Sequence, residues 1–380
     1  MKKLNKVAGL VALATTSSLL PVSAANAAGT ITFGEDRYVS VGFGLIGSYN
    51  STEDGFNNGA DDSNDFSLNH GRIYLAGALN KYIKGMLNTE ISGPSNSSQV
   101  IDAVGIFELT PNFSIWAGRF LSPSSRANMA GPFYTSGDGY WADLTARYGW
   151  NGGVIGRDDG VAVVGTTLDQ RLAYSFGAFE GKDIFRFSVG ADGSGLEDRS
   201  TADDDELMYA GRLQYSFWDK EPGYYGTGNY LGTKDIFTIG VAAREKGDGA
   251  SSAFAVGDYS QWTVDLLIEK KFAPGAVSLE AAYFDYDTDD VFLSEQGDAY
   301  YASLGYIFNQ KVGWGQFMPF VRYQSFDTDD TTVGEIERTD FGVNYIIDGY
   351  NASITAVYKD LESDFADDQD IFDVSVQLQF

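Results

Sequence analysis

Apolar and polar residues alternate strictly at the C-terminal end of the chain. From Phe372 to Phe380 every second residue is apolar. The residues between them are polar, namely Asp373, Ser375, Gln377 and Gln379. Side chains of a β-strand point to opposite faces with a period of two, so this strand has one apolar and one polar face. An apolar outer face around a water-filled interior is typical of a transmembrane β-barrel, provided that the pattern recurs along the chain.

The alternation recurs in sixteen segments of strand length, which are enough strands to enclose an aqueous channel. The clearest are residues 38–49, 71–79, 82–92, 208–217, 236–244, 262–271, 277–286, 299–308, 317–326, 339–347 and 353–359. A Lys or Arg on the lipid face costs about 2–4 kcal/mol at the bilayer midplane, so charged positions indicate the inner face. We therefore predict an all-β fold, a transmembrane antiparallel β-barrel of about 16 strands.

The connections between these segments alternate between short and long. The short ones, at residues 80–81, 110–112, 169–170, 273–275 and 348–350, are rich in the residues of tight turns, so we place them in the periplasm. The long ones, at residues 50–65, 180–205, 287–297, 327–335 and 362–369, are acidic, and we place them outside the cell. Both ends of the barrel domain are then periplasmic. One connection breaks the rule, because residues 219–233 are long and yet fall on the periplasmic side.

The first 27 residues have the features of a cleaved export signal. Lys2, Lys3 and Lys6 precede an apolar stretch at 8–20, and small residues follow at 25–27. The alternative, a retained membrane anchor, is disfavoured because the apolar run is too short to cross ~30 Å of hydrocarbon. We therefore expect a signal peptide at 1–27 and an outer-membrane barrel domain at 28–380.

Composition narrows the possible partners. The chain holds 26 basic and 53 acidic residues, a net charge of −27, which becomes −30 once the three lysines of the signal are removed. Nucleic-acid binding needs clustered Lys and Arg, so we do not expect it. The chain has no cysteine and therefore no disulfide or thiolate metal site. We expect no cofactor. The many glycines and aromatic residues, with 23 Tyr and 26 Phe, fit strands with aromatic girdles.

The segment from residue 113 to residue 147 mixes turn-forming residues with large aromatics, so it can fold and pack as an ordered loop. Folded inward, it would narrow the lumen as a constriction loop. The charged residues that would then meet a passing solute are Arg119, Arg126, Arg147, Asp138 and Asp143. Fixed opposite charges across a narrow pore sort solutes by charge. The alternative is a lid that packs on the outer rim.

Two acidic stretches, residues 284–290 and 325–330, resemble each other. Clustered carboxylates can bind Ca²⁺ or Mg²⁺. Neither stretch fits the ordered twelve-residue calcium loop, however, so we favour a solvated acidic rim that contacts lipopolysaccharide phosphates through loosely bound cations.

Four short segments of the chain resemble strands of the phosphate-selective porin O/P family of Gram-negative outer-membrane porins. They are residues 66–77 (FSLNHGRIYLAG), 112–123 (NFSIWAGRFLSP), 210–216 (AGRLQYS) and 342–345 (GVNY). The resemblance implies a sixteen-stranded outer-membrane porin, a homotrimer and a constriction loop after residue 121.

The lumen of this chain differs from that of a phosphate-selective member, which is expected to carry dense Arg and Lys. The candidate inward-facing cations are Arg72, Lys84, Arg212, Arg244, Arg322, Arg338 and Lys359. The candidate inward-facing anions are Glu90, Asp265, Glu269, Glu280, Asp340 and Asp373. A mixed lumen favours a general pore for passive diffusion of small hydrophilic solutes and inorganic ions, with an anion-selective, phosphate-type porin as the alternative.

Two other classes of protein remain to be weighed. An enzyme in a barrel needs a histidine or paired carboxylates beside a nucleophile, and the single histidine, His70, has no serine partner that the sequence identifies. We therefore expect no enzymatic activity and interpret His70 as a polar residue of the pore wall. A structural barrel or adhesin with acidic surface loops would not conduct. It would need a plugged lumen, and the sequence offers no separate plug domain.

Overall fold

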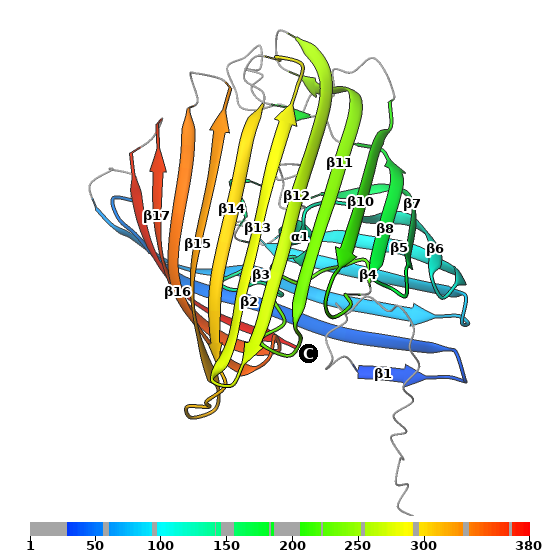
Figure 1. Cartoon of the computed structure of the whole chain (residues 1–380), viewed down its shortest axis with the longest axis horizontal. Helices are drawn as coiled ribbons and strands as arrows, with labels where there is room; N and C mark the ends of the chain where they lie inside the picture. Colours follow the sequence, from blue (N-terminus) through cyan, green and yellow to red (C-terminus); the bar gives the residue numbers. More distant parts are fainter. Residues whose placement is uncertain are drawn as a thin grey trace, which may run out of the picture.

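The computed structural model describes residues 29–55, 61–92, 97–140, 142–145, 156–181, 184–185, 206–221, 223–251, 255–291, 296–329, 334–364 and 367–380. These residues form a β-barrel with one short helix, α1 (Arg126–Ala130), inside its outline (Figure 1). The expected signal peptide, residues 1–27, lies outside the described residues.

Sixteen antiparallel strands of the described chain make the barrel wall, as the alternation predicted. In order they are β2 (Tyr38–Thr52), β3 (Ser63–Ala78), β4 (Ile83–Ser92), β5 (Ser97–Thr110), β6 (Phe113–Leu121), β7 (Arg157–Thr167), β8 (Leu172–Phe179), β10 (Met208–Ser216), β11 (Ile236–Ser251), β12 (Val256–Phe272), β13 (Gly275–Asp287), β14 (Gly297–Phe308), β15 (Gln316–Thr328), β16 (Glu335–Asp348), β17 (Ala352–Ser363) and β18 (Gln369–Gln379). Each strand pairs with the next, and β18 pairs with β2 to close the ring.

Two further strands are short and lie beside this wall. β1 (Gly29–Thr32) pairs with the start of β2, on the same edge that β18 occupies farther along β2. β9 (Ile184–Phe185) pairs in parallel with the end of β11, while β8 and β10 pair directly with each other. The sixteen-membered ring is therefore continuous without either of them.

The wall has the predicted apolar outer face. On β18, Phe372, Val376 and Leu378 are exposed, whereas Asp373 and Ser375 between them are buried. Aromatic rings pair across neighbouring strands on the same outer face. The contacts are Trp262 with Tyr283 (5.4 Å between ring centroids), Tyr300 with Tyr323 (5.7 Å), Phe217 with Phe237 (4.6 Å) and Phe317 with Tyr345 (5.0 Å). Outer-membrane barrels carry girdles of aromatic residues where the wall meets the two membrane interfaces.

The connections alternate as predicted. Tight turns join β5 to β6, β12 to β13 and β16 to β17, and the start of β2 and the end of β18 lie at the same end of the barrel. Several strands extend farther toward the long connections than the alternation indicated. Pairing of β11 with β12, for example, continues to Ser251 after an irregularity between Lys246 and Ala250. Outward residues there include Glu245 and Asp258, so the apolar alternation no longer marks the strand although the backbone ladder continues.

No helix among the described residues is long and apolar enough to cross a bilayer.

The outward face of β12 offers a test of the wall's orientation. Val264 lies there, 39 % exposed, near the middle of the strand. Val264→Lys is expected to lower the free energy of unfolding in lipid vesicles by about 2–4 kcal/mol, because the ammonium would face hydrocarbon. Denaturant titration with the heat-modifiable gel shift measures this, and Val264→Leu is the control. Equal stability of the two variants would show that this face does not meet lipid.

Candidate functional site: the barrel interior

The described part of the connection between β6 and β7 lies within the barrel. We call its described residues, 122–140 and 142–145, the inner loop. Asp138 of this loop accepts hydrogen bonds from Arg322 on β15 (3.1 Å) and Lys359 on β17 (2.5 Å). On β18, Gln377 donates to the carbonyl of Phe133 (3.0 Å). These wall side chains all point away from the lipid face, so the inner loop crosses the interior toward the far wall.

Buried ion pairs attach the loop to the strands from β15 to β17. Arg322 is about 1 % exposed and lies between Asp138 and Asp340, 2.7 Å from the latter. Arg338 contacts Asp143 at 2.6 Å and Asp340 at 3.2 Å. Removing one partner of a buried pair leaves an uncompensated charge, which costs about 3–5 kcal/mol. These pairs therefore hold the loop in place.

Aromatic contacts attach the same loop to β3. The ring of His70 lies 5.5 Å from that of Tyr140 and 6.1 Å from that of Phe133. Its Nδ1 is 2.9 Å from Glu90, which also bonds Arg72. Arg72 in turn lies over the ring of Phe133. His70 is thus a residue of the inner wall that contacts the loop.

Two glycines allow this close packing. A Cβ at Gly44 on β2 would lie 3.1 Å from the ring of Phe133, so a larger residue would push the ring away from the wall. Gly137 has φ +123°, and a Cβ there would lie 2.2 Å from Arg322. Glycine is needed at residue 137 both for its backbone conformation and for the approach of the guanidinium.

A second segment enters the interior from the short-turn end. We call residues 217–235, apart from Pro222, which lies outside the described residues, the β10–β11 segment. Its Glu221 accepts two hydrogen bonds from Arg126 of the inner loop, at 2.9 and 2.8 Å. Its Tyr224 packs on Trp116 of β6, with 4.8 Å between ring centroids. The sequence showed only that this connection was too long for its side of the barrel.

Packing of these segments gives part of the interior an apolar core. Inward-facing residues of β5, β6 and β8 in this core include Val104, Ile106, Trp116, Phe120 and Phe179. They pack against Leu121, Met129 and Tyr224 rather than facing water. The same core continues over β12 to β15 through Tyr259, Phe284, Tyr301 and Phe326, which lie among the inward charges of those strands. The expectation of a polar interior is therefore wrong for β5, β6 and β8 and only partly correct for the strands from β10 to β18.

Two of the charged residues expected at the constriction, Arg119 and Arg126, do not line a solvated path in the structure. Arg119 is wrongly assigned, because it lies on the outer face with its side chain 45 % exposed and pairs with Asp159 on β7 (2.9 Å). Arg126 is about 1 % exposed, so in this structure it binds Glu221 and the carbonyl of Thr227 rather than facing a solvated path. Arg147 lies outside the described residues.

The other predicted lumen cations lie on the inner wall and are paired. Arg212 bonds Asp265 at 2.5 and 2.8 Å and the carbonyl of Ser124 at 3.0 Å. Arg244 donates to the carbonyl of Pro123 (3.1 Å), and Lys84 bonds Glu108 (2.7 Å).

The predicted lumen anions are likewise buried. Glu269 accepts hydrogen bonds from the backbone N–H groups of Tyr230 (2.7 Å) and Gly232 (2.6 Å). Glu280 accepts one from the hydroxyl of Tyr301 (3.1 Å), and Asp373 one from the amide of Asn50 (2.6 Å). These three carboxyl groups therefore accept hydrogen bonds from neutral donors of the wall and of the β10–β11 segment.

Some inward charges near the inner loop retain contact with water. Side-chain exposure is 26 % for Asp143, 15 % for Lys359, 14 % for His70 and 10 % for Arg338. These four side chains come from the inner loop, β17, β3 and β16. Among the ionisable side chains that tie the loop to the wall, these four retain the most contact with water.

A cavity of about 700 Å³ lies at the short-turn end, below the inner loop. Six tyrosines take part in its wall: Tyr134, Tyr174, Tyr224, Tyr225, Tyr230 and Tyr350. Three of them belong to the β10–β11 segment. The segment therefore bounds the cavity at the short-turn end, next to the inner loop.

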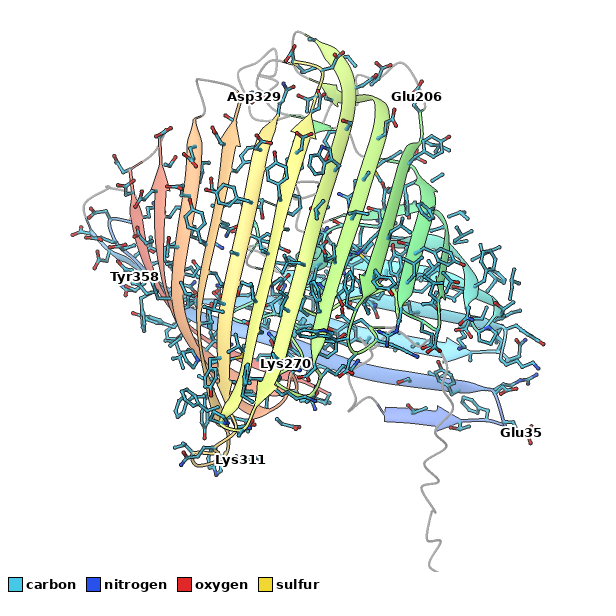
Figure 2. The ribbon with its side chains drawn as sticks, viewed as in Figure 1. Glu35, Glu206, Lys270, Lys311, Asp329 and Tyr358 are labelled. Atoms are coloured by element: carbon cyan, nitrogen blue, oxygen red, sulfur yellow. The ribbon has the colours of Figure 1, made fainter. Side chains whose placement is uncertain are left out.

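The end with the long connections carries the acidic rim. Asp329 and Glu206 lie at this end, and Lys311 at the other (Figure 2). The amide of Gln296 donates to both Asp290 (3.0 Å) and Asp329 (3.1 Å), which brings the two similar acidic stretches together. The pKa of Glu53 is raised, first by its hydrogen bond with Asp370 and then by repulsion from that carboxylate. No group of metal-binding residues is found in the described part of the chain.

Comparisons with known proteins identify the fold. No protein-family model and no curated relative matches the sequence. Among solved structures, the chain is similar to an anion-selective porin from Comamonas acidovorans, with a TM-score of 0.59 and 13 % identity over 90 % of this chain and 100 % of that one. It is similar to OprB from Pseudomonas putida, with a TM-score of 0.62 and 10 % identity over 90 % of this chain and 94 % of that one.

A third similar structure is OmpF from Salmonella typhi in complex with daunomycin, with a TM-score of 0.59 and 12 % identity over 93 % of this chain and 100 % of that one. At these identities the likeness shows a shared architecture, the sixteen-stranded barrel of porins. The more specific resemblance to the phosphate-selective O/P family stays a prediction.

Two ion pairs, one buried in the interior and one exposed at the short-turn end, test how the loop is held. Arg322→Ala is expected to lower the free energy of unfolding by about 3–5 kcal/mol, because Asp138 and Asp340 lose a buried partner. Lys270→Ala removes an exposed pair with Asp235 (2.7 Å) at the short-turn end and is expected to cost about 0–1 kcal/mol. Denaturant titrations of both variants in the same vesicles measure the difference. Equal losses would show that the interior pair does not anchor the loop.

Proposed function

We propose that this protein is an outer-membrane porin, a channel for passive diffusion of small hydrophilic solutes and ions. The observation that carries the proposal is a closed sixteen-stranded barrel with an apolar, aromatic outer face and charged residues on its inner wall. Such a wall places the barrel in a bilayer and gives its interior the polarity that hydrated solutes need. The likeness to porin structures supports the same function.

The path that we propose runs beside the inner loop, along the charges that remain in contact with water. Arg338 lies there in contact with Asp143 (2.6 Å), and Lys359 in contact with Asp138 (2.5 Å). Charges of both signs favour weak selectivity over strict exclusion of one ion. This supports a general porin, with the inner loop as its constriction. An anion-selective, phosphate-type porin is the alternative, in which the two cations outweigh the aspartates.

A specific observation favours a second candidate, a structural barrel that does not conduct. Most inward charges are buried, and two segments occupy the interior; Asp265, Arg322 and Asp340 are each about 1 % exposed. A barrel filled in this way can stay closed and present its acidic rim to a partner. Liposome swelling separates the candidates. Vesicles that contain the protein should swell in an isotonic solution of a small sugar or salt if it is a porin, and should not swell if it is closed.

The remaining assignments belong to the same proposal. One of the similar structures, OmpT of Vibrio cholerae, is described as a trimer form, and we propose a homotrimer for this chain as well. Outer-membrane lipid and lipopolysaccharide would surround it, with no enzymatic activity and no cofactor. Export would remove residues 1–27, so the intact mass of the outer-membrane form should correspond to residues 28–380. A mass that includes Met1 would contradict cleavage.

Selectivity provides a test at Lys359. Lys359→Gln is expected to shift the zero-current potential in a planar bilayer toward cation preference, because it removes a partly solvated cation from the path. Arg119→Gln is the matched control, since it removes a cation from the outer face. A potential that is unchanged by Lys359→Gln, or shifted equally by both variants, would remove Lys359 from the path.

A further inference from the structure

The β10–β11 segment differs from the other connections at the short-turn end. Where β12 passes to β13, two residues suffice to reverse the chain. β10 and β11 are equally close, because the N–H of Asp219 donates to the carbonyl of Asp235 (3.0 Å). The fifteen residues between these two are therefore not needed to join the strands. They rise into the barrel instead.

The segment meets the inner loop along several residues. Backbone N–H groups of Gly226 and Gly228 donate to the carbonyls of Met129 (3.2 Å) and Tyr134 (2.8 Å). The amide of Asn229 donates to Ser136 (2.7 Å). The contact therefore runs from α1 to the middle of the inner loop.

The ion pair between Arg126 and Glu221 lies at one end of this contact. Its two side chains are 1 % and 4 % exposed. Arg126 also donates to the carbonyl of Thr227 (2.9 Å), and its backbone N–H donates to Asp265 on β12 (3.0 Å). A bidentate arginine–carboxylate pair fixes orientation as well as distance. It joins the two segments and the wall at one point.

The segment is also anchored to the wall on both sides. On one side Tyr224 packs on Trp116 and Phe120 of β6. On the other, Glu269 of β12 binds the backbone of residues 230 and 232, and the hydroxyl of Tyr350 bonds Asn229 (2.8 Å). A segment with these contacts occupies a defined part of the lumen's cross-section.

We infer that the β10–β11 segment is a second pore-shaping element, which supports the inner loop from the periplasmic side and narrows the lumen together with it. The inference rests on the proposed channel function. It assigns Glu221 as the residue that positions Arg126, and it makes the tyrosine-lined cavity of about 700 Å³ the vestibule between the two segments and the periplasm. The inner loop and the β10–β11 segment, which enters from the short-turn end, then both narrow the pore.

An engineered disulfide tests the contact without measuring conductance. A Cβ built on Gly226 lies 3.9 Å from the Cβ of Met129, within the 3.5–4.5 Å range typical of disulfides. The chain has no cysteine of its own. Met129→Cys with Gly226→Cys should therefore form an intramolecular disulfide in the folded protein, seen as a mass loss and a gel shift that reductant reverses. The single variants are controls. A folded double variant that stays reduced under oxidant would overturn the inference.

Replacing the segment tests its effect on the pore. Residues 220–234 are replaced by Asn-Gly, which suits a two-residue hairpin between strands already paired at Asp219 and Asp235. We expect the single-channel conductance to rise about twofold or more, because part of the lumen is cleared. An unchanged conductance, in a variant with a normal heat-modifiable gel shift, would overturn the inference.

Glu221→Gln tests the same element if the replacement does not fold. It should loosen the inner loop and increase current fluctuations severalfold. Asp169→Asn is the matched control, because it removes the exposed Lys220–Asp169 pair of the same segment (2.7 Å). Equal fluctuations in the two variants would contradict the positioning role of Glu221.

The outcomes also separate this inference from the proposed function. If the natural protein does not conduct but the replacement variant does, the general porin is wrong and the segment closes the barrel. If neither conducts, both the porin function and the pore-shaping role are wrong. If the natural protein conducts and the replacement conducts equally, the porin function stands and the inference falls.

Discussion

Backbone polar groups have no hydrogen-bonding partners in lipid, and this constraint determines the rest of the structure. A chain whose strands cross a bilayer must pair every strand on both sides, which requires closure of the ring. Here β18 pairs with β2, so every strand of the wall is paired on both sides. The outward side chains can then be apolar, because no unpaired backbone group faces lipid. Closure also creates an interior shielded from lipid. Buried charged residues such as Asp265 and Arg322 lie there, away from hydrocarbon.

The interior of this barrel holds two segments of the chain besides the side chains of the wall. These segments occupy much of it, and arginine–carboxylate pairs are among the contacts that join them to the wall and to each other. Arg322 joins loop and wall, and Arg126 joins the loop to Glu221. Each of these charges is buried, so removing one partner leaves the other uncompensated and lowers the free energy of unfolding strongly. The intact pair, by contrast, contributes little more to stability than apolar residues of the same size would. The pairs therefore define where the segments sit, and the remaining space defines any path for solutes.

Strand number, connection lengths and the faces of β12, β16 and β18 could be predicted from sequence, because lipid imposes a strict alternation on them. The face of β6 on which Arg119 lies could not be predicted in this way. On β6, Trp116 and Phe120 point inward and Ile115 outward, so both faces are apolar and alternation does not distinguish them. The partner of Arg126 lies 95 residues away on a connection whose length alone was unusual. Such contacts depend on how the interior is packed, which local sequence patterns do not report.

The central claim is that a narrow aqueous path remains beside these segments. Its most direct test is the single-channel conductance of the mature protein, refolded and inserted in a planar bilayer under a salt gradient. The account predicts discrete open channels with a small zero-current potential, since the path is bordered by Asp143 as well as by Lys359 and Arg338. A barrel that inserts fully folded and shows no conductance would contradict it.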